Sequence, residues 1–264
     1  MYTDAHIHTM FSGDSDTPPE MQIEKAISLG MERICFTDHH DPCVKSDVDF
    51  ELDYNSYFPK MQELKEKYAK SIDIGIGVEL GLQSHISPLL REISEKYPFD
   101  FIIGSIHFVD GYDPYYPEYF ELYGSRGYKR YFDTTLECLQ TAPYFDSMGH
   151  LDYIARYGGP FGLTYSYSEY ADSIDPILKL LIDSGKALEC NTGGLSRGLD
   201  EPNPCYDVLR RFRELGGELI TLGSDAHDPS TLGYHFDEVG EQLRAIGYTH
   251  YAVYRDRKPQ MLPL

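Results

Sequence analysis

The sequence is poor in basic residues. Its 264 residues include 23 lysines and arginines against 43 aspartates and glutamates, which gives a formal net charge of −20. Proteins that bind nucleic acid usually carry a basic stripe, and none is found along this chain. DNA and RNA are therefore not expected as partners. A small phosphorylated substrate remains compatible with the charge, because bound divalent cations can dominate the local field.

Cysteine is also scarce. The five cysteines are odd in number and widely spaced, and no Cys-x-x-Cys motif occurs. This pattern is typical of reduced thiols in a cytoplasmic protein. The sequence also lacks a signal peptide and any apolar run long enough to span a bilayer. A cytoplasmic protein with no membrane partner is therefore expected; the sequence indicates no particular oligomeric state.

Strand-like and helix-like segments alternate along the chain, and 109–124 and 151–167 are expected as loops. Strands are expected over 2–8, 31–37, 71–80, 99–107, 145–150, 186–191 and 218–224, and helices over 17–30, 56–70, 88–96, 125–141, 168–184, 204–215 and 235–246. Thr17 and Ser87 are the expected caps of the first and third helices. Such alternation is typical of a parallel sheet. It favours one α/β domain over residues 1–264, a nearly closed (β/α)7 TIM-like barrel, with an open doubly wound sheet as the alternative.

The segment Asp4-Ala5-His6-Ile7-His8 carries the first chemical signal. Residues two apart in a strand point to the same side, so Asp4, His6 and His8 share one face. Two imidazoles placed in this way can bind one metal ion, and Asp4 can orient them from behind. A half-buried strand that merely contains two histidines explains this short motif about equally well. The rest of the chain must therefore decide.

Histidines and carboxylates recur where the other expected strands end. In a (β/α) barrel these ends lie on one face, which carries the chemistry. Six of the ten histidines fall there, more than isolated core histidines would explain. The nine candidate metal ligands are His6, His8, Asp14, His39, Glu79, His107, His150, Asp225 and His227.

The mixture of imidazole and carboxylate suits zinc, manganese or iron. Nine ligands exceed what one ion needs, so two to three divalent ions are expected, and Glu79 is the best candidate to bridge two of them. Two close ions acidify a shared water, and the resulting hydroxide is a nucleophile at neutral pH. The pattern therefore predicts hydrolysis, most naturally at phosphorus.

Several short motifs occur in a characteristic order. They are Thr37-Asp38-His39, Gly77-Val78-Glu79, Gly104-Ser105-Ile106-His107, Gly149-His150-Leu151-Asp152 and Gly223-Ser224-Asp225-Ala226-His227. With the N-terminal histidine pair, this set resembles the PHP (polymerase and histidinol phosphatase) superfamily over nearly the whole chain. Ser105-Ile106-His107-Phe108-Val109 and Asn191-Thr192-Gly193-Gly194 make it most similar to the histidinol-phosphatase family. The resemblance implies a distorted seven-stranded PHP barrel, a trinuclear metal site and release of phosphate from L-histidinol phosphate in histidine biosynthesis.

The resemblance also implies how the ligands divide. The first ion would take His6, His8, Glu79 and Asp225; the second would take Glu79, His107 and His150; the third would take His39, His227 and Asp14. Many superfamily members have histidine where Asp14 stands. Asp225 is the candidate to steer the nucleophile or accept a proton at the first ion. His227 is the candidate to act near the leaving oxygen if the third position is vacant.

Two arginines are candidates to bind phosphate, since the planar guanidinium can bond two oxygens. Arg197 lies in a glycine-rich turn after the expected strand 186–191, which supplies no ligand, and Arg156 follows His150 by six residues. A solvated surface arginine is the alternative for each. His40, beside His39, is equally well explained as a substrate contact and as a polar core residue.

These observations predict a metal-dependent phosphomonoesterase that acts on L-histidinol phosphate. One alternative keeps the metals and changes the substrate to another phosphoester, such as a phosphotyrosyl peptide, a nucleotide or a nucleic-acid end. Another is a non-catalytic metal-binding protein on the same fold. The acidic composition argues against nucleic acid, and the complete set of ligand positions argues against a protein without catalysis.

Overall fold

The computed structural model describes residues 2–264 and is built around a parallel sheet. The strands of this sheet are β1 Asp4–Ile7, β2 Arg33–Phe36, β3 His39–His40, β4 Asp73–Gly81, β5 Phe101–Ser105, β6 Ser147–Met148, β7 Ala187–Asn191 and β8 Ile220–Gly223. Seven of them follow the order β1-β2-β4-β5-β6-β7-β8, and the short β3 pairs with β4 beyond the end of β2. Each expected strand overlaps one of these seven.

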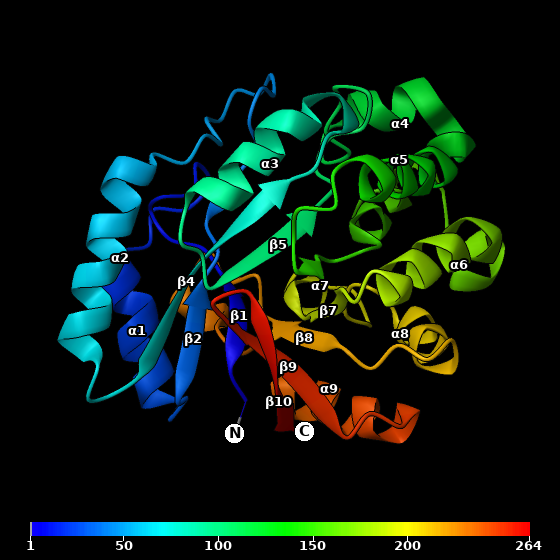
Figure 1. The fold of residues 1–264 in the computed structure, drawn as a ribbon. Helices are drawn as coiled ribbons and strands as arrows, with labels where there is room; N and C mark the ends of the chain where they lie inside the picture. Colours follow the sequence, from blue (N-terminus) through cyan, green and yellow to red (C-terminus); the bar gives the residue numbers. More distant parts are fainter. Residues whose placement is uncertain (1) are drawn as a thin grey trace.

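The two edges of the sheet meet, so that it forms a nearly closed barrel (Figure 1). Ile7 in β1 forms a parallel bridge with Ala226, just after β8. The His8 amide donates to the carbonyl of Ala226 at 3.0 Å, and the Asp225 amide donates to the carbonyl of His6 at 2.9 Å. An open doubly wound sheet would keep these edges apart, so the barrel prediction is confirmed.

Helices cover the outside of the barrel (Figure 1). The α-helices are α1 Pro19–Ser28, α2 Tyr54–Tyr68, α3 Ser87–Lys96, α4 Pro117–Tyr123, α5 Gly127–Thr141, α6 Tyr167–Asp183, α7 Gly193–Ser196, α8 Tyr206–Glu214 and α9 Phe236–Ile246. Short 3₁₀ turns are η1 Ser84–Ile86, η2 Gly124–Arg126, η3 Tyr153–Arg156, η4 Gly159–Phe161 and η5 Pro229–Thr231. None of the helices within residues 2–264 has the length and apolar character needed to cross a membrane.

Two local predictions about the helices are wrong. Thr17 does not cap α1, because its hydroxyl donates to the carbonyl of His227 at 2.7 Å. Ser87 lies inside α3, and its hydroxyl donates to the carbonyl of Thr141 at 2.6 Å. In both cases a distant backbone acceptor, which local sequence does not reveal, competes with the cap.

The segment 109–124, expected as a loop, contains the helix α4. Pro117 occupies its first turn, where proline is well tolerated. Tyr119 and Phe120 are buried against the rest of the protein. Seven residues are too few to show a clear period, and tertiary packing of the two aromatic rings stabilises this helix.

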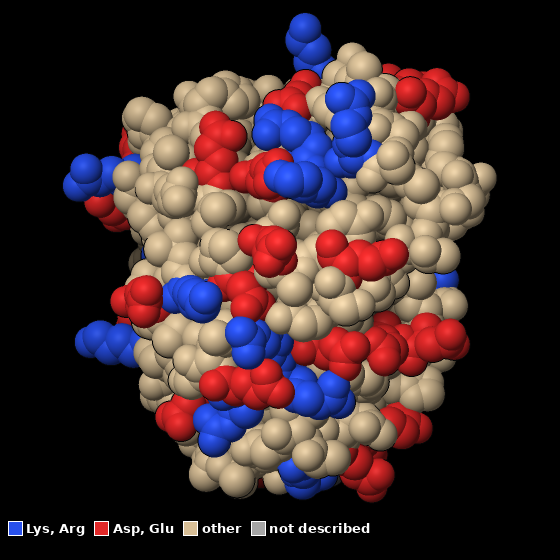
Figure 2. All heavy atoms as spheres, turned by 90° about the vertical axis from the view of Figure 1, so that its right-hand side faces the viewer, with Lys and Arg blue, Asp and Glu red and all other residues tan. Residues whose placement is uncertain are grey.

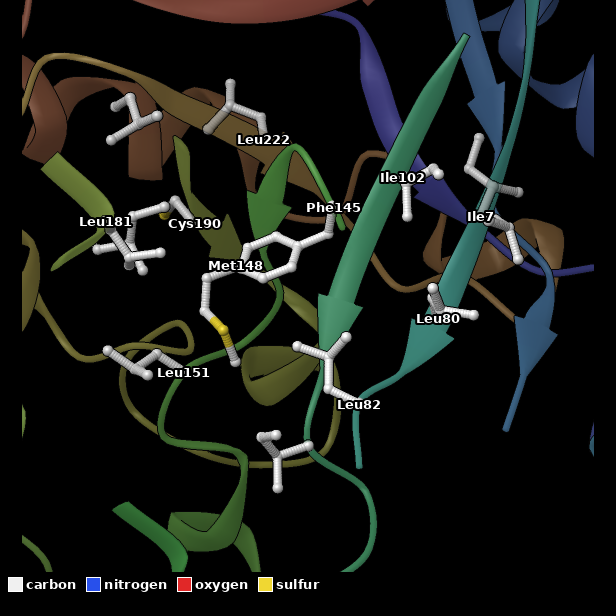
Figure 3. Close-up of a cluster of buried hydrophobic side chains, with 14 of the residues drawn as sticks. Ile7, Leu80, Leu82, Ile102, Phe145, Met148, Leu151, Leu181, Cys190 and Leu222 are labelled. Atoms are coloured by element: carbon white, nitrogen blue, oxygen red, sulfur yellow. The ribbon is translucent and has the colours of Figure 1, made fainter. Parts of the chain in front are cut away.

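Apolar side chains fill the space between the sheet and its helices. Figure 3 shows part of this cluster, with Phe145, Met148, Ile102 and Leu222 among the labelled side chains, and all four are buried. Gly104 in β5 leaves the room that the Phe145 ring occupies, because a Cβ atom there would lie 2.5 Å from the ring. The strands are therefore held by close packing that leaves their carboxyl ends free for polar side chains.

The opposite end of the barrel is covered by an antiparallel hairpin, β9 His250–Arg255 and β10 Lys258–Pro263, beside both chain termini (Figure 1). The Tyr254 ring stacks on Phe101 with centroids 4.9 Å apart. Arg33 donates to the carbonyl of Tyr254 at 2.7 Å. The apolar residues near 250–254 thus belong to a strand. Its partner β10 is largely exposed, which explains why hydrophobic patterning did not predict it.

Candidate metal centre

Glu79 lies at the centre of the ligand cluster, fully buried near the end of β4. Its Oε1 lies 2.8 Å from His150 Nε2 and 3.2 Å from His107 Nε2. Its Oε2 lies 3.0 Å from His39 Nδ1 and 3.2 Å from His6 Nε2. One carboxylate therefore faces imidazoles from four different parts of the barrel rim.

Asp225 provides a second carboxylate beside the N-terminal histidine pair. Its Oδ1 lies 3.4 Å from His8 Nε2 and 3.9 Å from His6 Nε2. Its backbone has a φ of 56°, in the left-handed region that non-glycine residues seldom adopt. Such a conformation is often found at functional sites, where surrounding contacts stabilise it. Here the contact is the hydrogen bond from the Asp225 amide to β1.

Asp14 lies at the outer edge of the cluster. Its Oδ2 is 3.1 Å from His227 Nε2 and 3.6 Å from His39 Nε2. The Nδ1 of His227 lies 3.0 Å from the carbonyl of Asp225. A carbonyl can only accept, so Nδ1 carries the proton, and Nε2 of the neutral ring keeps its lone pair for a ligand.

All nine expected ligands thus come together at one end of the barrel. Four groups of three could each hold an ion: His6, His8 and Asp225; His6, Glu79 and His150; His39, Glu79 and His107; His8, His39 and His227. This grouping differs from the division that the family resemblance implies, because His39 lies close to Glu79 and His107 as well as to His227.

Buried atoms in the cluster fit divalent cations. Within residues 2–264, the ring nitrogens His6 Nε2, His8 Nε2 and His39 Nδ1 and the oxygen Glu79 Oε2 have no hydrogen-bond partner. A buried polar atom without a partner costs roughly 1–3 kcal/mol. Nitrogen lone pairs that face a carboxylate at this range repel it unless a proton or a cation lies between them. Divalent transition metals accept both kinds of ligand.

The ionisation states of Glu79 and His8 suit metal binding, whereas the carboxylates around His6 and His39 outweigh burial and raise the pKa of those two rings, so that an ion bound there must displace a proton. Burial opposes the charged form of Glu79, but the nearby imidazoles of His6 and His107 outweigh it and lower its pKa well below the ordinary value. Burial, reinforced by the neighbouring ring of His227, lowers the pKa of His8 well below its ordinary value. Metal ligands must be deprotonated, so an ionised carboxylate and a neutral imidazole are the required forms.

Polar residues behind the rings hold them in place. His107 Nδ1 lies 2.9 Å from Asp41 Oδ1, and His8 Nδ1 lies 3.0 Å from the hydroxyl of Ser12. In each ring the other nitrogen, Nε2, faces Glu79. Such partners fix the tautomer and orientation of a metal-binding histidine. No local pattern marks Asp41 or Ser12 for this role, although both lie within four residues of a candidate ligand.

Asp4 does not orient the histidine rings, contrary to the expectation from its spacing. Its carboxylate accepts hydrogen bonds from the amides of Ser224 and Gly233, both at 3.0 Å. The place behind His6 is taken by Glu189 of β7, whose Oε1 lies 2.6 Å from His6 Nδ1. The sequence feature that could have indicated this role is the position of Glu189, a charged residue inside an otherwise apolar strand.

The cluster opens into a cavity of about 310 Å³. Aromatic side chains form much of its wall: Phe50, Phe108, Tyr115, Tyr116, Tyr153 and Tyr157. Asp113 also lines it, and burial raises the pKa of this carboxyl to about 6. The cavity therefore joins a candidate cation site, an apolar wall and a further carboxylate.

Both candidate arginines reach the cavity and converge on Asp225. The side chain of Arg156 is 5 % exposed; its Nε donates to Asn203 Oδ1 at 2.8 Å, and its Nη1 lies 3.4 Å from Asp225 Oδ2. Arg197 Nη1 also lies 3.4 Å from Asp225 Oδ2, and the side chain is 40 % exposed. Burial opposes ionisation of Asp225, but Arg197 foremost among its neighbours holds its pKa well below the ordinary value. Two guanidinium groups at one edge of the cluster can bind an anion.

His40 does not reach this cavity. Its Nδ1 accepts a hydrogen bond from the Leu52 amide at 2.8 Å, and its ring packs on Tyr54 with centroids 5.1 Å apart. Burial lowers its pKa. Of the two roles that the sequence left open, the polar core residue matches this placement.

Comparisons with known proteins agree with this arrangement. The PHP domain family model matches residues 4–193. The chain is 35 % identical to a probable histidinol-phosphatase of Clostridium acetobutylicum, over 89 % of this chain and 90 % of that protein. It is 34 % identical to a histidinol-phosphatase of Lactococcus lactis, over 85 % and 83 % of the two chains. The crystal structure of histidinol phosphate phosphatase from Lactococcus lactis, in complex with zinc, L-histidinol and phosphate, superposes with a TM-score of 0.89. The sequences are 29 % identical, and the match covers 98 % of each chain.

The contacts of Glu79 predict the effect of Glu79→Gln. Gln keeps the volume of the side chain but removes the charge and one acceptor oxygen, so the variant should retain at least one ion fewer per chain than the wild-type protein. Elemental analysis after gel filtration measures this. Glu92→Gln makes the same chemical change at an exposed position of α3 and should keep the full complement. At most one ion in the wild-type protein, or equal metal content in wild type and Glu79→Gln, would contradict the multinuclear centre.

Proposed function

This chain belongs to the PHP domain family, and from that premise we propose that it is a histidinol-phosphatase. The reaction is hydrolysis of L-histidinol phosphate to L-histidinol and inorganic phosphate. The observation that carries the proposal is the convergence of six imidazoles with Glu79, Asp14 and Asp225 around buried atoms that lack hydrogen-bond partners in the described chain. The two arginines beside this cluster supply what a phosphate ester additionally requires.

The nine clustered side chains would hold two to three divalent ions, of which zinc fits the donor set well. When bound, such ions neutralise phosphate charge and lower the pKa of a coordinated water. Glu79 would bridge ions with its two oxygens, since each oxygen faces a different pair of imidazoles. The full complement of ligands argues against a non-catalytic member of the family.

Arg156 and Arg197 orient the phosphate. Their Nη1 atoms both approach the same carboxylate oxygen of Asp225, so an anion beside Asp225 would meet two guanidinium groups at once. Arg156 is held from behind by Asn203, which limits the freedom that it loses on binding. Arg197 is more exposed, and its Nη1 also donates to the carbonyl of Gly193 at 3.1 Å.

Asp225 and His227 complete the reacting end of the site. The low pKa of Asp225 makes it a weak base, which favours a role in steering the attacking water over one in storing its proton. His227 lines the cavity, with its Nε2 3.1 Å from Asp14 Oδ2; if the third ion position is vacant, this nitrogen can take up a proton and is the candidate to place it on the leaving oxygen. In this step the oxygen of water bonds to phosphorus and the phosphorus–oxygen ester bond breaks; the alcohol oxygen takes up one proton, and the proton that the water gives up replaces it.

The cavity wall suits the rest of L-histidinol phosphate. Tyr115, Tyr116 and Tyr157 offer faces against which a flat imidazole can pack. Asp113 offers a carboxylate for the amino group, and the Tyr115 amide donates to its Oδ1 at 2.8 Å. These features favour a small aromatic cation that carries phosphate.

A nucleic-acid end is a weaker candidate substrate. The formal net charge is −20, and lysines and arginines are interspersed with aspartates and glutamates on the face drawn in Figure 2. A nucleic-acid track would instead require a continuous basic surface. The cavity volume of about 310 Å³ also suits a small molecule.

The activity is tested with metal-loaded protein and a panel of phosphate monoesters. We expect L-histidinol phosphate to give the highest kcat/KM, and a chelator to abolish turnover. Because water attacks phosphorus directly, a single turnover in heavy-oxygen water should place the label in inorganic phosphate. Label in a protein carboxylate would indicate a covalent route, and equal turnover of unrelated monoesters would refute the substrate assignment.

The arginine contacts predict a loss of phosphate binding in Arg197→Ala and in Arg156→Ala. Each variant should lower kcat/KM for L-histidinol phosphate by ~10²-fold, the upper range for a charge-assisted hydrogen bond, with metal content unchanged. Arg210→Ala removes an exposed arginine that pairs with Asp207 on α8 and should leave kcat/KM unchanged. An Arg197→Ala variant with wild-type kcat/KM would remove this residue from the site.

The raised pKa of Asp113 predicts that substrate capture depends on pH. Burial raises its pKa to about 6, and bound cations nearby would lower it again. Ionised Asp113 attracts the amino group and protonated Asp113 does not, so the ratio of kcat/KM for wild type to that for Asp113→Asn should rise with pH. We expect the smallest ratio at pH 5 and about tenfold at pH 8.

Titration of the substrate phosphate cancels in this ratio, because both proteins meet the same substrate. Asp172→Asn, at an exposed position of α6, should give a ratio near one at every pH. A pH-independent ratio for Asp113→Asn would mean that its charge does not contact the substrate.

A further inference from the structure

Strand β7 supplies none of the clustered ligands within residues 2–264, yet it places a buried carboxylate directly behind them. Glu189 is 1 % exposed. Its Oε1 lies 2.6 Å from His6 Nδ1, and its Oε2 accepts from the His150 amide at 2.8 Å and from Asn191 Nδ2 at 3.1 Å. A buried carboxylate is costly unless its oxygens are satisfied, and these three donors satisfy it.

We propose that Glu189 is a positioning residue that sets two metal ligands at once. Its bond to His6 Nδ1 places the proton on that nitrogen and leaves the Nε2 lone pair facing Glu79 Oε2, 3.2 Å away. Its bond to the His150 amide fixes the turn after β6, from which His150 Nε2 reaches Glu79 Oε1 at 2.8 Å. This inference rests on the metal centre of the proposed function.

The surrounding packing holds Glu189 in this orientation. A Cβ atom at Gly223 would lie 2.3 Å from Glu189 Oε1 and 2.4 Å from the Cβ of His6. Glycine at the end of β8 therefore makes the space in which the carboxylate meets the ring. The side chains of Glu189 and Asn191 share one face of β7, and Asn191 Oδ1 lies 3.3 Å from Arg156 Nη2. One strand thus supports both the metal ligands and a phosphate-binding arginine.

The hydrogen-bond pattern requires a carboxylate at this position. Three donors converge on two oxygens, whereas glutamine has one acceptor oxygen and an amide nitrogen that donates. In Glu189→Gln that nitrogen would face either His6 Nδ1 or the pair formed by the His150 amide and Asn191 Nδ2. In the first case the amide nitrogen donates to His6 Nδ1, so His6 takes the tautomer with its proton on Nε2. In the second case the amide nitrogen, a donor, faces two other donors, the His150 amide and Asn191 Nδ2.

The test is a zinc titration of metal-free Glu189→Gln, with the free ion buffered by a competing chelator. We expect at least one ion to bind 10- to 100-fold more weakly than in the wild-type protein, the usual cost of losing a partner of this kind. Excess zinc should restore much of the lost kcat, because mass action refills a weakened site. A variant that is simply misfolded would not recover in this way.

Asp146→Asn is the matched control. Asp146 is a buried carboxylate near the closed end of the barrel, where it accepts from the Ile102 amide and from Arg257. Its substitution makes the same loss of charge and should lower the stability of the metal-free protein without changing zinc affinity. Equal zinc affinities for wild type and Glu189→Gln would overturn the proposal.

A second measurement covers the case in which Glu189→Gln does not fold. Imidazole nitrogen chemical shifts of the zinc-loaded wild-type protein, assigned with His6→Asn, should show a protonated Nδ1 in His6; an unprotonated Nδ1 would overturn the proposal. A wild-type protein that binds no zinc would overturn both this inference and the proposed function. If zinc binding and the Glu189→Gln effect are present but L-histidinol phosphate is not hydrolysed, the substrate assignment alone fails.

Discussion

The carboxylate of Glu79 is the constraint on which the rest of the structure depends. It is fully buried among imidazoles from β1, from β3 and from the segments after β5 and β6. An ionised group in a low-dielectric interior must be paired with opposite charge. The serine of β5 supplies one neutral donor, since the Ser105 hydroxyl bonds to Oε1 at 2.6 Å. The rest of the negative charge on Glu79 must be balanced by cations or by protonated rings, which is why we interpret the site as a metal centre.

The barrel makes this crowding possible. Parallel strands end on one face, so each strand delivers its terminal side chains to the same small volume. The opposite end is closed by the β9–β10 hairpin, and ion pairs such as Arg257 with Asp146 fasten it. Aromatic and aliphatic packing around Phe145 stabilises the wall between these two ends. Burial of the polar cluster costs free energy, and the apolar packing of the rest of the fold offsets it.

The charged groups around the centre differ in sign between its buried side and its solvent side. Behind the rings, Asp41 and Glu189 hold His107 and His6, while the Ser12 hydroxyl holds His8. On the solvent side, Arg156 and Arg197 lie beside Asp225. Negative groups inside favour cations, and positive groups outside favour an anion bound across them. This order is what hydrolysis of a phosphate ester by a metal centre requires, and it links the proposed function to the role inferred for Glu189.

The sequence by itself determined the alternation of strands and helices, and with it the barrel, because hydrophobic periodicity is local and strong. It also determined the nine candidate ligands, since histidines at successive strand ends have no simple structural explanation. It did not identify α4, β10 or the true partners of Thr17 and Ser87, whose conformations depend on distant contacts. Only the tertiary structure decided that Asp4 turns to backbone amides, that His40 is a core residue, and that Glu189 stands behind His6. The physical reason is that a ligand's own position follows from its strand, whereas the partner that orients it comes from another strand far along the chain, through a hydrogen bond that no local pattern encodes.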